Sequence, residues 1–61
     1  MKVKCEYIKE GARTVETWYF CSMIKYDPVH VLLQFDSQNV YLPTAQILQI
    51  NIEADPDTLI F

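Results

Sequence analysis

The stretch "VHVLLQFDSQNVYLP", residues 29–43, decides the fold class because two apolar segments flank a short polar one. In its first half every second residue is large and apolar, the period-2 pattern of a strand with one buried face. The polar residues 36–39, "DSQN", predict a turn, because Asp, Ser and Asn side chains hydrogen-bond to their own backbone. A second short strand then returns beside the first. The residues expected to face inward are Val29, Val31, Leu33, Phe35, Val40 and Leu42.

The segments before this hairpin also predict strands. In residues 2–7 the apolar Val3, Cys5 and Tyr7 alternate with charged residues, and Gly11, the only glycine, follows at the natural place for a hairpin turn. Residues 14–26, "TVETWYFCSMIKY", are rich in β-branched and aromatic residues and predict a long second strand that bends across a barrel. Asp27-Pro28 ends this strand, because proline cannot donate to a ladder.

The segment after the hairpin allows two interpretations. Near residues 43–46 the sequence predicts a single helical or 3₁₀ turn with Thr44 as its cap, and residues 46–52, "QILQINI", then predict a closing strand. A helix over residues 44–53 fits the spacing of the apolar residues about as well. The β-branched isoleucines and Asn51 favour the strand.

Five short strands in a chain of 61 residues predict an all-β fold, a small antiparallel barrel or sandwich. A partly closed five-stranded barrel is favoured, because closure removes exposed edges. We expect residues 1–54 to form this single domain and residues 55–61 to form a tail. The apolar end of the tail, "TLIF", either adds a short sixth strand or plug to the barrel or serves as a short linear motif.

Residues 23–50 resemble the second half of an Sm-like domain, of the kind found in the bacterial RNA chaperone Hfq. The similarity implies an Sm-like or SH3-like barrel, and with it a homo-oligomeric ring or an RNA-binding protein. The basic pair that follows the tyrosine in the RNA chaperone is replaced here by Leu42-Pro43. The corresponding elements are a bent strand at Met23-Ile24, an aromatic-Asp turn at Tyr26-Asp27, an apolar strand at 29–35, a polar hairpin at 36–39, a short Tyr-bearing strand at 40–42, a helical corner at 43–45 and a closing strand at 47–50.

Charge is distributed unevenly along the chain. The net charge is −3, and all five Lys and Arg residues lie within residues 1–25. Nucleic-acid affinity depends on neutralising phosphates, so we expect no nucleic-acid groove in the acidic second half. An acidic face instead favours a basic protein partner. The carboxylates of this half are Asp27, Asp36, Glu53, Asp55 and Asp57.

The sequence predicts a cytoplasmic protein without a cofactor. No apolar run is long enough to span a membrane, and the N-terminal segment lacks the apolar core of a secretory signal. Cys5 and Cys21 are then expected to be reduced, buried strand residues, with a disulfide between them as the alternative for an exported protein. Two cysteines and one histidine at no ligand-like spacing predict no metal site.

The sequence offers no converging catalytic groups, so we expect no enzyme. His30, the only histidine, lies between valines on a predicted strand, away from any nucleophile in sequence. Aromatic residues suited to binding are more evident than catalytic groups. Alternation places Trp18 and Tyr19 on opposite faces of a strand, so one of them faces solvent or a partner. The alternative is that Trp18 and Phe20 fill the barrel while Tyr19 covers an edge.

These features together predict a non-catalytic protein-binding module. It would be a small acidic regulator or inhibitor, of the phage or mobile-element type, that occludes the surface of a partner protein. The alternative is an Sm-like homo-oligomer that binds RNA or serves as an assembly protein. The residues predicted to bind the partner are Trp18, Tyr19, Tyr26, Leu32, Tyr41, Asp36, Glu53, Asp55 and Asp57.

Overall fold

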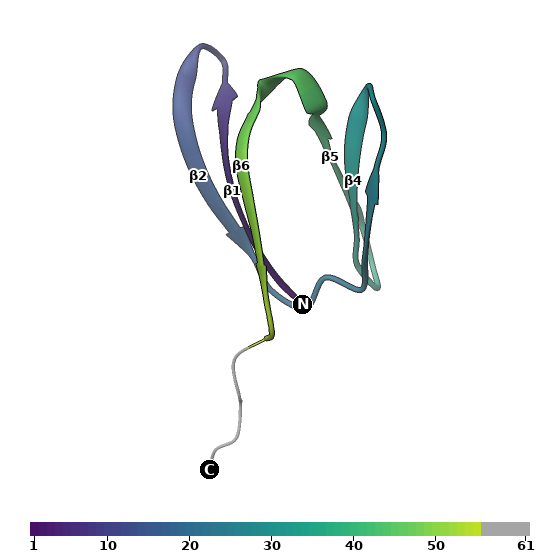
Figure 1. Ribbon diagram of the computed structural model, residues 1–61. Coiled ribbons are helices and arrows are strands. Elements are labelled where there is room, and N and C mark those ends of the chain that lie inside the picture. Colours follow the sequence, from purple (N-terminus) through teal and green to yellow (C-terminus); the bar gives the residue numbers. More distant parts are fainter. Residues whose placement is uncertain (56–61) are drawn as a thin grey trace.

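The computed structural model describes residues 1–55, and these residues form strands and one 3₁₀ turn (Figure 1). The predicted all-β class is confirmed. No helix in the described part of the chain is long and apolar enough to cross a membrane. The elements are β1 (Lys2–Lys9), β2 (Ala12–Trp18), β3 (Met23–Tyr26), β4 (His30–Gln34), β5 (Asn39–Pro43), the 3₁₀ turn η1 (Thr44–Gln46) and β6 (Ile47–Glu53).

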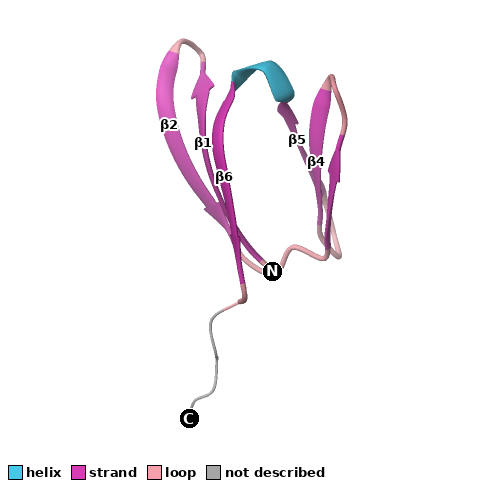
Figure 2. Ribbon diagram, in the orientation of Figure 1, coloured by secondary structure: helices cyan, strands magenta, loops and turns pink. Residues whose placement is uncertain are grey.

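The strands form two antiparallel sheets of three strands each, in the orders β2-β1-β6 and β3-β4-β5. Figure 2 shows them as two layers, joined at one end by the segment between β2 and β3 and at the other by η1. The predicted long strand over residues 14–26 is in fact two strands, one in each sheet. Residues 1–55 therefore do not form the five-stranded barrel favoured from the sequence.

The long strand is interrupted at Phe20, whose φ angle is +60°. This left-handed conformation is uncommon for a residue with a side chain, and it ends the regular alternation of a strand. Backbone bonds hold the segment that follows: Cys21 N–H donates to the carbonyl of Met1 at 2.9 Å, and Ser22 N–H donates to that of Gln34 at 2.8 Å. The chain thus passes from one sheet to the other at this corner.

Asp55 holds the corner from the end of β6. One oxygen of its carboxylate accepts a hydrogen bond from Phe20 N–H at 2.8 Å, and the other lies 3.0 Å from the Met1 ammonium. The same ammonium donates to the carbonyl of Cys21 at 2.6 Å. The hydrogen bond from Phe20 and those from the ammonium lower the pKa of Asp55, so the carboxylate stays charged in mild acid.

The predicted turns are present. Glu10 and Gly11 connect β1 to β2 with φ angles of +51° and +81°, the two positive values that a two-residue type I′ hairpin requires. Asp27 accepts a hydrogen bond from Val29 N–H at 2.9 Å and so shapes the turn between β3 and β4. The polar hairpin closes where Phe35 N–H donates to the carbonyl of Gln38 at 2.9 Å.

Residues 44–53 form a 3₁₀ turn followed by a strand, so the strand interpretation is confirmed and the helix is excluded. The predicted cap is wrong, because η1 has no side-chain cap. Instead the Thr44 hydroxyl donates to the carbonyl of Asp27 at 2.7 Å, and its N–H donates to that of Val29 at 3.0 Å. Thr44 thus joins η1 to the turn between β3 and β4.

Both sheets contribute to the core. The predicted inward residues Val31, Leu33 and Leu42 are buried, and Phe35 and Val40 pack partly buried against them. Val29 is the exception, with 66% of its surface exposed, because it lies in the turn before β4 begins. Both cysteines are buried free thiols. Cys5 lies on β1 as predicted, whereas Cys21 lies in the segment between β2 and β3 and not on a strand. The core consists of Val3, Cys5, Tyr7, Cys21, Val31, Leu33 and Leu42.

Two substitutions test this core, each at a position that the sequence predicts to face inward. Leu33→Ala is expected to lower the free energy of unfolding by about 2–5 kcal/mol, because it leaves a cavity at a fully buried position. Val29→Ala is expected to change it by less than about 0.5 kcal/mol, because the side chain is exposed. Urea unfolding monitored by circular dichroism measures both, and similar losses in the two variants would contradict the assignment of Val29 to the surface.

Candidate functional site

The outer face of the sheet β3-β4-β5 carries a row of three side chains that the core does not use. Lys25, Leu32 and Tyr41 lie directly opposite one another on the three strands, and residues that are opposite in antiparallel strands share a face. Leu32 is half-buried, whereas Tyr41 is 60% exposed. The His30 ring meets the Tyr41 ring edge-on, with 6.3 Å between centroids.

These side chains surround a shallow hollow of about 280 Å³, lined also by Asp27. One cation and one anion stand beside an aromatic and an aliphatic residue, a combination that suits the insertion of a partner's side chain. We call this surface the outer patch, defined by Lys25, Asp27, His30, Leu32 and Tyr41.

The outer face of the other sheet has a different character, because four of its charged side chains form ion pairs within the chain. Lys2 and Glu53 are opposite each other on β1 and β6, with 3.5 Å between the ammonium and the carboxylate. Glu6 and Arg13 form a second ion pair on the same face. Glu53, predicted to rim a partner contact, is thus held by an internal ion pair.

Two of the predicted partner-binding residues, Leu32 and Tyr41, lie in the outer patch. Tyr19 and Glu53 lie elsewhere, both beside the Lys2 ammonium. Trp18 is half-buried and packs against the core, which agrees with the alternative that it and Phe20 fill the interior. Phe20 departs from that alternative, because it is 60% exposed. Tyr19 lies at the corner, 6.5 Å from the Phe20 ring and beneath the Lys2 ammonium.

The remaining predicted site residues are scattered. Tyr26 is exposed but lies opposite Val31, on the inner face of its sheet. Asp36 is exposed on the turn between β4 and β5, and Asp55 is bound to the Phe20 corner. Asp57 and the apolar residues 59–61 lie outside the described part of the chain. The nine predicted residues therefore do not form one surface.

Sequence reasoning missed Lys25 and His30 as members of the outer patch. Each is close to Tyr41 only through the register of three strands, which the sequence alone does not give. Alternation along a single strand places them on the outward face but cannot say which side chains they meet.

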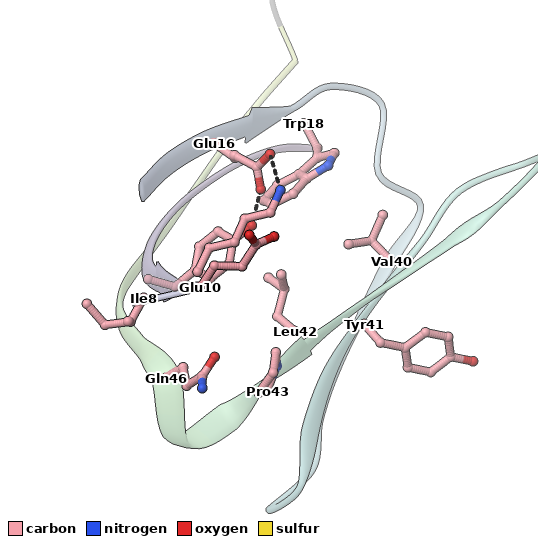
Figure 3. A pocket seen from close by; sticks show the side chains of 11 residues that line it. Ile8, Glu10, Glu16, Trp18, Val40, Tyr41, Leu42, Pro43 and Gln46 are labelled. Carbon is pink, nitrogen blue, oxygen red and sulfur yellow. Dashed lines mark hydrogen bonds and ion pairs between the residues drawn. The ribbon is translucent and has the colours of Figure 1, made fainter. Parts of the chain in front are cut away.

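A second group, also missed, lies between the sheets. Figure 3 shows Glu16 and Trp18 on one wall of a cleft of about 440 Å³, with Leu42 and Pro43 on the other. The Tyr7 hydroxyl donates to the Glu16 carboxylate, and Lys9 pairs with the same carboxylate at 3.9 Å. Burial, followed by the Glu16 hydrogen bond and charge, raises the pKa of Tyr7 to about 12, so the hydroxyl stays a donor at neutral pH.

In the described part of the chain, the histidine and the two cysteines do not lie together. His30 is exposed on the outer patch, whereas Cys5 and Cys21 are buried. Burial, and secondarily the Glu16 charge, raises the pKa of Cys5, which disfavours a reactive thiolate. Within residues 1–55 no three His, Cys, Asp or Glu side chains are grouped so that they could hold a metal ion.

Comparison of the chain with models of known protein families, with curated proteins and with solved structures finds no match. The function therefore has to be inferred from the outer patch and the cleft themselves.

The Tyr7–Glu16 contact predicts a specific loss of stability in alkali. A folded-state pKa raised from 10.0 to about 12 means that the contribution of Tyr7 is complete below pH 10 and disappears as the pH rises through about 12. Tyr7→Phe is expected to lower the free energy of unfolding by about 1 kcal/mol at neutral pH. Its difference from the parent protein should shrink above pH 10.

Urea unfolding of both proteins at several pH values checks this expectation. The raised pKa of Cys5, whose ordinary value is 9.0, adds an alkaline loss of stability to both proteins. The Cys5 charge also raises the pKa of Tyr7, so this loss cancels only in part in the difference between the two proteins. A constant difference between the two proteins up to pH 12 would show that the Tyr7 hydroxyl has no such role.

Proposed function

We propose that this chain is a non-catalytic protein-binding module, a small acidic cytoplasmic regulator or inhibitor that occludes its partner's surface with the outer patch. The observation that carries this proposal is the pair of half-buried Leu32 and exposed Tyr41, opposite each other on β4 and β5 beside a hollow. Tyrosine is a frequent anchor of protein interfaces, because it buries a large area at a low cost in side-chain entropy.

The charges around the patch support a partner with basic groups at the edge of its contact. Asp27 and Asp36 lie on the turns at the two ends of β4, and both are exposed. The chain as a whole carries a net charge of −3. Complementary charge at the rim mainly accelerates association, while Tyr41 and Leu32 supply the contact that excludes water.

Photo-crosslinking tests the patch directly. A photoreactive phenylalanine at position 41 is expected to crosslink a protein in cells that carry this chain, whereas the same residue at position 20 is expected not to. Phe20 is a matched control because its side chain is also 60% exposed but lies at the corner, away from the patch.

Binding of the identified partner is then measured with purified proteins. Tyr41→Ala is expected to weaken binding by about tenfold or more, equivalent to at least about 1.4 kcal/mol, whereas Phe20→Ala should leave it unchanged. Equal weakening by the two substitutions, or equal crosslinking from the two positions, would contradict a binding surface centred on Tyr41.

A second candidate function is an Sm-like homo-oligomer that binds RNA. The elements of residues 23–50 follow one another in the order that the resemblance implies, from β3 through η1 to β6. In the described residues β2, β3, β5 and β6 each pair on one side only, so edge backbone groups are available to a second copy.

Light scattering coupled to size-exclusion chromatography separates the two candidates. The regulator is expected to be a monomer or dimer without measurable RNA affinity, because no cation follows Lys25. A ring of five to seven copies, or RNA binding that weakens steeply with added salt, would establish the alternative and exclude the regulator.

A further inference from the structure

The cleft between the two sheets has the chemistry of a site for a flat cation. Its lining shares only Tyr41 with the outer patch. Leu42 points into the cleft, whereas Tyr41 points away from it (Figure 3). At about 440 Å³ the cleft falls within the range of small-ligand sites, about 300–1,000 Å³.

The Glu16 carboxylate is held in place but its charge is weakly balanced. The buried Tyr7 hydroxyl donates to one of its oxygens, Oε1. The other oxygen, Oε2, faces the Lys9 ammonium at 3.9 Å, near the limit of an ion pair. The Lys9 side chain is 51% exposed, and a solvated pair of this kind contributes little free energy. A ligand cation can therefore replace Lys9 at Oε2 without a large penalty.

The walls of the cleft favour a cation with an apolar face. Trp18 lies two residues from Glu16 on β2, so both side chains are on the inner face, and the indole is half-buried. Val40 and Leu42 of β5 line the opposite side. Guanidinium is planar, weakly hydrated and stacks on aromatic rings, whereas ammonium is a strongly hydrated point charge.

We propose that the cleft binds an arginine side chain presented by a protein or peptide, with the guanidinium hydrogen-bonded to Glu16 Oε2 and lying against the Trp18 indole. Charge complementarity supports this occupant, because Glu10 also lines the cleft and the two carboxylates outnumber Lys9. The site does not depend on the outer patch, so either surface can be disproved without the other.

The probe is a nine-residue peptide of glycine and serine with one central arginine, titrated to millimolar concentration into ¹⁵N-labelled protein. Saturable NMR shifts are expected at the Trp18 indole N–H and at the backbone amides of Glu16 and Leu42. The same peptide with citrulline, which keeps the shape and lacks the charge, is expected to bind about tenfold more weakly or not at all. A lysine peptide is expected to bind several-fold more weakly than the arginine peptide.

Two protein variants complete the test. Glu16→Gln is expected to weaken arginine binding about tenfold while an amide oxygen can still accept from Tyr7. Glu6→Gln makes the same charge change on the outer face of the same sheet and should leave binding unchanged. The peptide series uses the parent protein, so it stands even if Glu16→Gln fails to fold.

Absence of saturable shifts, or shifts confined to residues outside the cleft, would overturn the proposal. So would equal binding of the citrulline peptide, equal or tighter binding of the lysine peptide, or equal weakening by Glu6→Gln and Glu16→Gln.

Discussion

The apolar cluster to which β1 and β4 contribute most is the feature on which the rest of the structure depends. These are the central strands of the two sheets, and they supply five of the seven buried residues: Val3, Cys5, Tyr7, Val31 and Leu33. A domain of this size buries a small fraction of its surface, so every inward position on these strands is needed for stability. Apolar side chains that point outward, such as Tyr41, therefore require an explanation other than the core.

The Phe20 corner provides the second constraint. In the described residues no ladder connects the two sheets, and the chain crosses between them through a residue with a positive φ angle. Asp55, the Met1 ammonium and the carbonyl of Cys21 hold this crossing by charge-assisted bonds instead. Because β2 ends at Trp18, directly before the corner, the same bonds help to fix the wall of the cleft.

Local chemistry explains what the sequence could predict. The turns at Gly11, Asp27 and residues 36–39, the buried face of residues 31–33 and the strand over residues 47–53 follow from alternation and from turn-forming side chains. The break at Phe20 was missed because it depends on Asp55, which lies 35 residues away. If the alternation of side chains along a strand is continued through this break, Phe20 is assigned to the inner face together with Trp18. This is why one interpretation of the sequence placed Phe20 inside. The contact between Tyr7 and Glu16 and the row of Lys25, Leu32 and Tyr41 could not be predicted. Both depend on the pairing register of neighbouring strands, which local sequence patterns do not contain.

Register also links the core to the proposed binding surfaces. A one-residue slip of β5 against β4 would turn Tyr41 inward and Leu42 outward, because strand side chains alternate. Leu42 is 4% exposed and contributes to the core, so its burial opposes that slip. The interaction that stabilises the fold thus also holds Tyr41 on the outer patch and directs Leu42 toward the cleft. A substitution at Leu42 would disturb both surfaces, whereas one at Tyr41 leaves the core intact, and Tyr41 is accordingly free to serve recognition alone.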